Sequence, residues 1–580
     1  MKSSTQEDRA IAYQLGVLGL MQFKSGLYGD RTAFYLYEDR RWKEMTYSEL
    51  AEKVSQLSDY LIEQGVERGS PIAILSESRP EWPVAFFAAI RSGAIVVPLD
   101  IKLTEKELAS ILENSEPRVL FVSSQMLKTA RSLQAQLPFL MDVVVIDQRE
   151  STGDYPSFDQ LRASTTYEGR EREFDETALI VYTSGTTGAP KGVMISFRNL
   201  AYQVMNVECV MKLTSKDVLL SMLPLNHLLE LTCGLLGVLY AGGSICYCHS
   251  LFPHEIAEVM REKRVTAMIT VPLFLKMLKG SIEKEVERAG IKNRRVFRIA
   301  ERVASWTGPR FVRRLLFSKV HKQFGGRLKT FISGGAPLDP EVEKFFCRLG
   351  IPIYQGYGLT ETSPVISVNT PKAHRLNSVG RPLEGAAVRI LNGGTKEGEG
   401  QILTAGPHVM KGYYKREDLT ETAIDLEGWF HTGDLGRLDK DGFLYVTGRL
   451  KNLIVLGSGK KVNPEEVEAA ICGSPLVKEV CVIGRLSQNG LMRGSEEVCA
   501  VVVPVEPIVR QLKERSEILE VIKKELGRLS VDLAPYKHPS RVYIHFEDLP
   551  KTTTRKIKRA ALLEWIERQE EVPAEASLLR

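Results

Sequence analysis

Eleven consecutive residues, Tyr182-Thr-Ser-Gly-Thr-Thr-Gly-Ala-Pro-Lys-Gly192, carry most of the information in this sequence. They continue an apolar run at 179–183 that predicts a β-strand. Small residues let backbone N–H groups converge on an anion, the hydroxyl groups add donors, and Lys191 adds a positive charge. The stretch therefore favours a phosphate-binding loop over a surface turn that is merely rich in Gly, Ser and Thr. It is not a Walker loop, because Pro190 stands where the glycine before the lysine is required.

Apolar runs and helical patterns alternate on both sides of this loop. Further strands are expected at 71–76, 94–99, 119–123, 143–147, 218–223, 267–271 and 330–333, and a helix at 82–91. Near-continuous apolar strands separated by helices are typical of parallel sheets that helices cover on both faces. The first two thirds of the chain therefore predict an α/β fold.

The pattern changes near residue 377. Short strands punctuated by glycine are expected at 388–391, 401–405 and 443–446, which indicates a β-rich subdomain. Beyond 448–451, helices at 465–472 and 512–526 alternate with strands at 480–483, 498–505 and 542–546. About 130 residues of this α+β pattern are enough for a small domain. We predict a large N-terminal domain at 1–448, with two packed αβ sheet subdomains (1–376) and a β-rich subdomain (377–448), followed by a small α+β domain at 452–580.

Composition excludes several classes of protein. The 580 residues are 43% hydrophobic and 26% charged, which is ordinary for globular domains and argues against disorder or a disulfide scaffold. A net charge of +5 over this length implies by itself no nucleic-acid or membrane partner. Eight cysteines without a Cys-x-x-Cys pair are typical of reduced thiols in the cytosol.

Two uncharged runs need separate interpretation. The run at 11–23 predicts an amphipathic first helix rather than a signal peptide, because acidic residues precede it and no small-residue cleavage site follows. The 18 uncharged residues at 231–248 just reach the length of a membrane span. Gly242 and Gly243 interrupt them, so we expect a buried helix followed by a strand that contains Cys246 and Cys248.

Several motifs in a fixed order point to one family. The loop at 182–192 resembles the phosphate-binding signature of the adenylate-forming superfamily, which includes acyl-CoA synthetases, luciferases and the adenylation domains of peptide synthetases. Further segments of this chain resemble the other landmarks of that superfamily, in the same order. They are Met45-Thr-Tyr-Ser-Glu-Leu50, Leu223-Pro-Leu-Asn-His227, Ser333-Gly-Gly-Ala-Pro337, Tyr354-Gln-Gly-Tyr-Gly-Leu-Thr-Glu-Thr362, Gly428-Trp-Phe-His-Thr-Gly-Asp434 and Gly448-Arg-Leu-Lys451. The match runs from about Gly29 to Arg559, and the chain is most similar to long-chain fatty acid–CoA ligases.

The resemblance implies a reaction in two steps. A carboxylate and ATP give an acyl-adenylate and pyrophosphate, with Mg²⁺ neutralising phosphate charge, and the thiolate of CoA then gives the thioester. The residues implied at the phosphates are Thr183, Ser184, Gly185, Thr186, Thr187 and Lys191. The residues implied at the adenine are Gly335, Ala336, Pro337, Gln355, Gly356, Gly358 and Tyr357, which stacks on the base. Thr360 is expected to contact the α-phosphate, and Glu361 to bind Mg²⁺ as a hard oxygen ligand.

Roles nearer the C-terminus also follow from the resemblance. Asp434 is expected to bind the ribose hydroxyls and Arg449 to support the same ring, although an Asp in such a setting is also a common turn former. The residues 449–451 are the expected hinge, with Lys451 as the pivot about which the small domain moves.

The segment 549–559 resembles the catalytic-lysine segment of the superfamily. This implies that Lys556 neutralises charge between the substrate carboxylate and the α-phosphate. Most members have Gly-Lys there, whereas this chain has Arg555-Lys556, and Lys551 and Lys558 are neighbouring alternatives. A solvated basic tail is the other interpretation.

The expected acid is a medium-to-long-chain fatty acid. His227 occupies the usual gate before the acyl pocket, and the helix expected at 228–240 is almost wholly apolar. Its Gly234 and Gly237 either leave a groove for an alkyl chain or allow tight helix packing. Peptide synthetases usually place an Asp in this helix for the substrate ammonium, and this chain has only Glu230, which disfavours an amino acid. A largely helical insertion at 282–329 resembles long-chain ligases.

The segment 291–330 is strongly basic. It contains 12 Lys and Arg residues against Glu301 alone, a local charge of +11. Apolar residues at helical spacing, such as Val296 and Ile299, accompany arginines such as Arg295 and Arg298. This pattern predicts peripheral contact with an anionic membrane, where each basic residue contributes about 1 kcal/mol. The alternative is that the apolar stripes pack on the enzyme and the arginines are solvated or bind CoA phosphates.

The sequence as a whole predicts an ATP- and Mg²⁺-dependent fatty acid–CoA ligase with CoA as co-substrate and no nucleic-acid partner. The alternatives are an acyl-carrier-protein ligase and a catalytically silent lipid-binding or scaffold relative. We expect a cytoplasmic protein, with the inner membrane surface as a second location, and the oligomeric state stays open.

Overall fold

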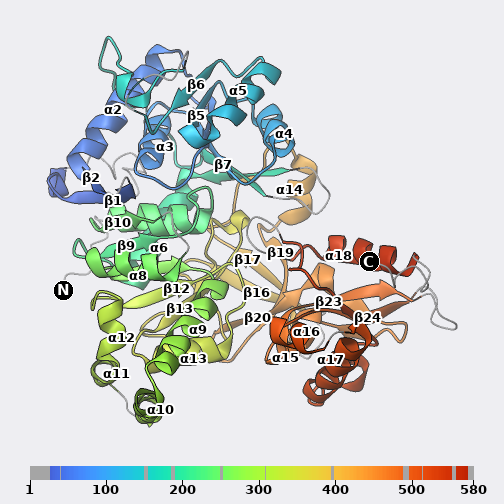
Figure 1. The fold of residues 1–580 in the computed structure, drawn as a ribbon. Helices are drawn as coiled ribbons and strands as arrows, with labels where there is room; N and C mark the ends of the chain where they lie inside the picture. The colour runs from blue at the N-terminus through green and yellow to red at the C-terminus, as the bar shows by residue number, and fades with distance from the viewer. Residues whose placement is uncertain are drawn as a thin grey trace. The chain divides into compact units, whose positions relative to one another are not determined.

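The computed structural model describes residues 26–38, 41–148, 150, 155–170, 172–183, 190–248, 252–306, 309–392, 398–487, 495–512, 514–551 and 557–571. The chain divides into two compact units (Figure 1). The first unit consists of residues 1–387 and 404–430, and the second of residues 388–403 and 431–580. The predicted division into domains at 1–448 and 452–580 describes which parts move relative to each other, and it stays a prediction.

The first unit contains two large sheets. The seven-stranded sheet has the order β18 (Gly412–Tyr413), β8 (Lys191–Ser196), β7 (Thr177–Thr183), β4 (Ile95–Pro98), β3 (Pro71–Leu75), β5 (Val119–Val122) and β6 (Asp142–Val145). The nine-stranded sheet has the order β15 (Arg381–Pro382), β14 (Ser367–Val368), β13 (Ile353–Tyr357), β12 (Thr330–Ser333), β11 (Ala267–Thr270), β9 (Val218–Ser221), β10 (Ser244–Tyr247), β1 (Thr32–Glu38) and β2 (Arg41–Thr46). The central strands of both sheets are parallel.

Helices cover both faces of each sheet. The shared core between the sheets contains α2 (Tyr47–Glu63), α3 (Glu81–Arg91), α6 (Phe197–Met211), the π-helix η3 (Leu229–Leu236) and α7 (Gly237–Tyr240). The outer face of the seven-stranded sheet packs on α4 (Glu105–Ser115) and α5 (Leu127–Gln136). The outer face of the nine-stranded sheet packs on α8 (Pro253–Glu262), α9 (Pro272–Arg288), α10 (Ile291–Trp306), α12 (Ser318–Gln323) and α13 (Pro340–Arg348). Short helices α11 (Arg310–Leu316) and α14 (Glu417–Ala423) complete the unit.

The motif at 45–50 is the start of a helix. Thr46 caps α2 by accepting the backbone N–H of Glu49, whose carboxylate accepts the N–H of Thr46 in return. Tyr47 is fully buried, and its hydroxyl donates to the carbonyl of Gly243 at 2.7 Å. This part of the superfamily resemblance therefore reports a local folding signal rather than a catalytic group.

The predicted α/β fold class is confirmed, since every strand expected before residue 334 is present within one or two residues. Hydrophobic runs locate buried parallel strands well because both faces of such strands are covered. The strands β1, β2 and β8, which carry polar residues, were not expected. The helix expected at 512–526 is displaced and begins at Arg515. The first helix expected at 11–23 lies outside the described residues.

The second unit is smaller and contains three sheets. Its elements are β16 (Ala387–Asn392), β17 (Gly400–Ala405), β19 (Phe430–Leu438) and β20 (Leu444–Arg449) in one sheet, the pair β21 (Ile454–Val455) and β22 (Lys461–Val462), and a third sheet of β23 (Val477–Leu486), β24 (Glu496–Pro504) and β25 (Arg541–Ile544). The helices α15 (Pro464–Ile471), α16 (Glu506–Gln511) and α17 (Arg515–Leu529) pack on one face of the third sheet. The helix α18 (Arg559–Glu571) packs on the other face.

Two predictions about the chain as a whole can be compared with this fold. None of the helices in the described part of the chain combines the length and the hydrophobicity that a bilayer-crossing helix needs. The run at 231–248 folds as a buried helix and the strand β10, as expected. Cys233, Cys246, Cys347 and Cys481 are thiols rather than members of disulfides.

Candidate active site

The phosphate loop connects two antiparallel strands of the first unit. Thr183, the last residue of β7, pairs with Lys191, the first residue of β8, so both stand at the mouth of the loop. The predicted residues Ser184, Gly185, Thr186 and Thr187 lie outside the described residues.

A tyrosine links this hairpin to the predicted magnesium ligand. Tyr413 lies on β18, which pairs with β8, and the Nζ of Lys191 is 5.7 Å from its ring centroid. The Tyr413 hydroxyl donates to Oε1 of Glu361 at 3.0 Å. Burial, reinforced by the negative charge of Glu361, raises the pKa of the Tyr413 phenol, so it remains a donor at neutral pH. No pattern in the sequence around Tyr413 marks it as part of the site, because only the pairing of β18 with β8 brings it there.

This arrangement suits Mg²⁺ and the phosphates of a nucleotide. Glu361 is half-buried and lies on the short helix η4 (Thr360–Thr362), where its backbone carbonyl accepts the N–H of Met410 at 2.9 Å. A carboxylate is a hard oxygen ligand of the kind Mg²⁺ prefers. Within the described residues no cluster of three or more His, Cys, Asp or Glu side chains could hold a metal ion.

The two predicted adenine segments leave neighbouring strands at the same edge of the nine-stranded sheet. Ser333 at the end of β12 pairs with Gln355 on β13 in a parallel ladder. The exposed residues Gly335, Ala336 and Pro337 follow β12, and Gly356 and Tyr357 complete β13. Gly358 has no room for a side chain, because a Cβ atom there would lie 1.8 Å from the carbonyl oxygen of Pro364. This glycine therefore allows the backbone at 364–366 to approach closely.

The predicted gate follows β9, at the same edge of the same sheet. His227 is half-buried, and its carbonyl accepts the N–H groups of Glu230 and Leu231 where the helix begins. The helix starts as the π-helix η3 rather than as the α-helix expected. Such helices are rare and often occur at functional sites.

The glycines of this helix serve tight packing rather than a groove. A Cβ atom at Gly234 would lie 2.6 Å from Oε1 of Glu230, and one at Gly237 would lie 2.7 Å from Cγ1 of Val207. Glu230 is fully buried, and neither of its carboxylate oxygens has a hydrogen-bond partner among the described residues. Burial raises the pKa of Glu230 to about 8, so it is mostly protonated at neutral pH. The alkyl groove at Gly234 and Gly237, one of two alternatives from the sequence, is therefore not present.

The second unit brings the two predicted ribose residues together. Asp434 on β19 is buried and lies opposite Arg449 on β20, and its Oδ1 is 2.9 Å from Nε of Arg449. The backbone N–H of Asp434 donates to the hydroxyl of Thr432 at 3.1 Å. Lys451, the predicted pivot, is exposed and lies in the short helix η5 (Leu450–Asn452).

The predicted catalytic Lys556 lies outside the described residues, but both ends of its segment are anchored. On one side, Lys551 pairs with Glu479, and on the other side Nη1 of Arg559 donates to Glu468 at 2.6 Å. Lys551 also forms a β-bridge with Ile557. This ion pair with Glu479 argues against Lys551 as the catalytic lysine.

Both parts of the chain match models of known protein families. A model of the AMP-binding enzyme family matches residues 24–414, and a model of the AMP-binding enzyme C-terminal domain matches residues 466–556. The chain therefore belongs to the AMP-binding enzyme family.

Individual relatives agree with this assignment. Long-chain-fatty-acid–CoA ligase ACSBG2 of Gallus gallus is 29% identical over 79% of this chain, and the alignment spans 63% of that ligase. Long-chain-fatty-acid–CoA ligase FadD15 of Mycobacterium bovis is 29% identical over 77% of this chain and 76% of its own length. Among solved structures, ATP-bound MatB from Rhodopseudomonas palustris aligns with a TM-score of 0.75 at 26% identity, over 95% of this chain and 99% of that one.

Proposed function

We propose that this protein is an ATP- and Mg²⁺-dependent ligase that joins a medium-to-long-chain fatty acid to CoA. The fatty acid carboxylate attacks the α-phosphate of ATP and gives acyl-adenylate and pyrophosphate; the CoA thiolate then attacks the acyl carbon, which gives acyl-CoA and releases AMP. The observation that carries this proposal is the grouping of Lys191, Tyr413 and Glu361 beside the phosphate hairpin. The two relatives named as long-chain fatty acid–CoA ligases support the choice of acid and acceptor.

The proposed roles follow the positions of the side chains. Thr183, Lys191 and the loop residues 184–187 hold the β- and γ-phosphates, and Thr360 contacts the α-phosphate. Mg²⁺, when bound, neutralises phosphate charge as the bond to the leaving pyrophosphate breaks. Tyr413 donates to Oε1 of Glu361 and so orients the carboxylate that would bind Mg²⁺.

The remaining roles concern the nucleoside, the lysine and the hinge. Residues 335–337 and 355–358 form the adenine pocket, and Asp434, held by Arg449, accepts hydrogen bonds from the ribose. Lys556 neutralises the charge that the carboxylate and the α-phosphate share in the first step. Between the two steps, residues 452–580 reorient about Lys451 relative to residues 1–448.

Pyrophosphate release with palmitate and ATP, measured with and without CoA, tests this function. We expect palmitate-dependent release of pyrophosphate, and palmitoyl-CoA together with AMP only when CoA is present. Release that holo-acyl carrier protein but not CoA accelerates would instead identify a carrier-protein ligase. Absence of pyrophosphate release with every acid from acetate to stearate would contradict an enzymatic role.

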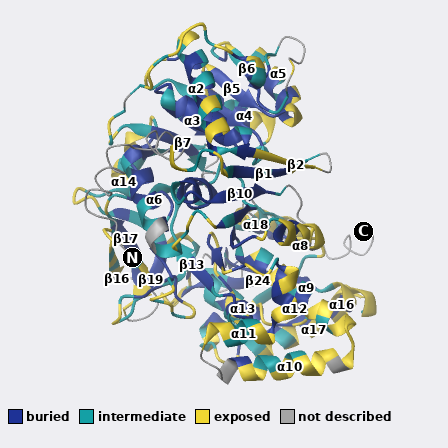
Figure 2. Cartoon of the chain, turned by 90° about the vertical axis from the view of Figure 1, so that its left-hand side faces the viewer, coloured by how far each residue is buried: buried dark blue, intermediate teal, exposed yellow. Residues whose placement is uncertain are grey.

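We further propose that the enzyme contacts anionic membranes through α10 and α11. Figure 2 shows α10 as a largely exposed helix at the surface of the first unit. Six apolar side chains of α10 and α11 are between 42% and 75% exposed, and together they are called the apolar row: Ile291, Val296, Ile299, Val303, Phe311 and Leu315. The opposite side of α10, with Phe297, Ala300 and Ala304, packs on the core, so the apolar residues predicted as one stripe belong to two faces.

The basic residues of this segment also divide into two groups. Arg310, Arg313 and Arg314 donate to backbone carbonyls within the first unit, at 3.1 Å, 3.2 Å and 2.7 Å respectively. These three arginines therefore stabilise the fold rather than face a membrane. The prediction that all 12 basic residues of 291–330 are available for membrane contact is wrong in this respect. Arg295 and Arg298 on α10 are exposed beside the apolar row. An exposed apolar row flanked by arginines is suited to the interface of an anionic bilayer.

Co-sedimentation with vesicles tests this contact. The wild-type protein is expected to pellet with phosphatidylglycerol vesicles at low salt and much less at high salt. Each basic residue near the anionic surface contributes about 1 kcal/mol of electrostatic binding energy, and salt screens this attraction. An Arg295/Arg298/Arg302→Glu variant should stay in the supernatant, and an Ile299/Leu315→Ser variant should bind more weakly at both salt concentrations. Phosphatidylcholine vesicles provide the uncharged control. Equal pelleting of wild type and the triple variant, or pelleting that is indifferent to salt, contradicts the proposal.

A further inference from the structure

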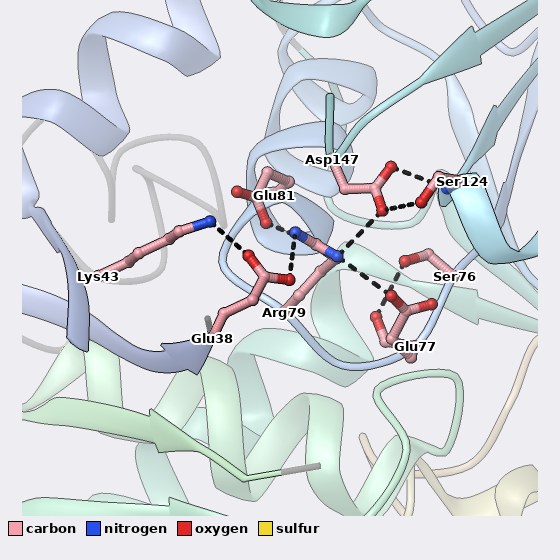
Figure 3. Close-up of polar contacts among 8 residues, drawn as sticks. All are labelled: Glu38, Lys43, Ser76, Glu77, Arg79, Glu81, Ser124 and Asp147. Atoms are coloured by element: carbon pink, nitrogen blue, oxygen red, sulfur yellow. Dashed lines mark hydrogen bonds and ion pairs between the residues drawn. The ribbon is translucent and has the colours of Figure 1, made fainter. Parts of the chain in front are cut away.

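A buried arginine lies at the carboxyl edge of the seven-stranded sheet, in the loop that follows β3. The side chain of Arg79 is 4% exposed and four carboxylates surround it (Figure 3). Its Nε is 2.8 Å from Glu81, its Nη1 is 3.1 Å from Glu77 and 3.2 Å from Asp147, and its Nη2 is 3.6 Å from Glu38. A buried guanidinium left without such partners would be strongly destabilising, so this ionic cluster fixes the loop that carries Arg79.

The ionic cluster connects the two sheets of the first unit. Asp147 follows β6 and Glu77 follows β3 in the seven-stranded sheet, whereas Glu38 is the last residue of β1 in the nine-stranded sheet. Two of the carboxylates have further partners of their own. The Nζ of Lys43 lies 2.5 Å from Glu38, and the hydroxyl of Ser124 donates to Asp147 at 2.7 Å. Figure 3 shows the carboxylates converging on Arg79 from separate segments, with Lys43 beside Glu38 and Ser124 beside Asp147.

Ser78 extends this fixed loop to the gate. Its hydroxyl accepts the backbone N–H of Leu225 at 3.1 Å and donates to the carbonyl of Leu223 at 3.3 Å. These two groups flank Pro224, which has no N–H of its own, in the loop that leads to His227. The gate loop of the nine-stranded sheet is therefore attached, through one hydroxyl, to a loop that the ionic cluster fixes on the other sheet.

We propose that Ser78 is a positioning residue of the acyl gate and that the ionic cluster around Arg79 holds it in place. This inference rests on the proposed function, in which His227 guards the acyl pocket. Ser78 fixes the backbone from which the His227 side chain projects, so loss of its hydroxyl loosens the gate and weakens binding of the fatty acid. The phosphate hairpin lies on β7 and β8 rather than on this loop, so ATP binding and adenylation chemistry stay intact.

Steady-state kinetics of four variants test the proposal. Loss of two hydrogen bonds in Ser78→Ala is expected to raise the KM for palmitate about five- to tenfold, with kcat and the KM for ATP within about twofold of wild type. Ser78→Thr keeps the hydroxyl and should restore most of the palmitate KM. Ser132→Ala is the matched control, because the hydroxyl that it removes donates to Glu105, which belongs neither to the ionic cluster nor to the gate loop. Glu38→Gln, which weakens the ionic cluster from β1, should raise the palmitate KM about two- to threefold.

Amide hydrogen exchange provides a readout that does not depend on activity. The backbone N–H of Leu225 loses its acceptor in Ser78→Ala, so exchange in the segment 222–228 is expected to accelerate, while Ser132→Ala leaves it unchanged. An unchanged palmitate KM or unchanged exchange at 222–228 in Ser78→Ala overturns the positioning role, as does an equal rise of both KM values. Wild-type enzyme that forms no acyl-CoA overturns the proposed function instead, while the exchange measurement still decides whether Ser78 holds the loop.

Discussion

Replacing Lys556 by alanine is expected to slow acyl-adenylate formation by a factor of about 100 to 1,000, because one preorganised charge at the reacting phosphate is removed. The segment that carries it is anchored at both ends, by Lys551 with Glu479 and by Arg559 with Glu468. The amide backbone and these anchors remain in the variant, so the loss reports on the ammonium group. Palmitate-dependent exchange of pyrophosphate into ATP measures this first step.

The second half-reaction should survive the same substitution. When palmitoyl-adenylate and CoA are supplied directly, the Lys556→Ala variant is expected to form palmitoyl-CoA within about threefold of the wild-type rate, since one lysine on a moving domain serves one step only. Lys558→Ala is the matched control, because it removes a nearby exposed lysine. Equal loss of both half-reactions would refute this separation of roles, and a larger loss in Lys558→Ala would transfer the role to that lysine.

Replacing Glu361 by glutamine is expected to lower the rate of adenylation about 100-fold or more and to raise the Mg²⁺ concentration needed for half-maximal rate. The amide has nearly the shape of the carboxylate, and its oxygen still accepts the hydroxyl of Tyr413, so the change removes mainly the negative charge. Titration of pyrophosphate release with Mg²⁺ measures both effects.

Tyr413→Phe separates the charge of Glu361 from its orientation. The variant removes the hydrogen bond that orients the Glu361 carboxylate, so we expect a loss of about tenfold in rate and a smaller rise in the Mg²⁺ requirement than in Glu361→Gln. If Glu361→Gln keeps the wild-type rate at low Mg²⁺, Glu361 is not the metal ligand. If Tyr413→Phe costs as much as Glu361→Gln, the tyrosine has a direct role in the reaction.

Local patterns in the sequence determined a large part of this fold. The buried parallel strands follow from continuous apolar runs, as at 119–122, because both faces of such strands exclude water. The start of α2 follows from Thr46 and Glu49, whose spacing is that of a capping box. The phosphate hairpin follows from the small and hydroxyl residues after β7. Each of these signals acts within about ten residues, so it can be read without knowledge of the rest of the chain.

Tertiary structure decided which distant residues meet. Tyr413 reaches Glu361 and Lys191 only because β18 adds to the edge of β8, more than 200 residues away in sequence. Ser78 reaches the gate loop only because the two sheets pack together. Neither residue has a neighbour in sequence that marks it as functional.

Tertiary structure also decided between interpretations that the sequence left open. The two glycines of the gate helix are covered by Glu230 and Val207 rather than by a substrate, because packing at close range fills any space that a missing side chain leaves. The arginines of 291–330 look alike in sequence, yet Arg314 binds the carbonyl of Leu328 while Arg298 faces solvent. The sequence therefore determined the elements, the family and the order of the motifs, whereas the partners and burial of each side chain depend on contacts between segments that local propensity does not encode.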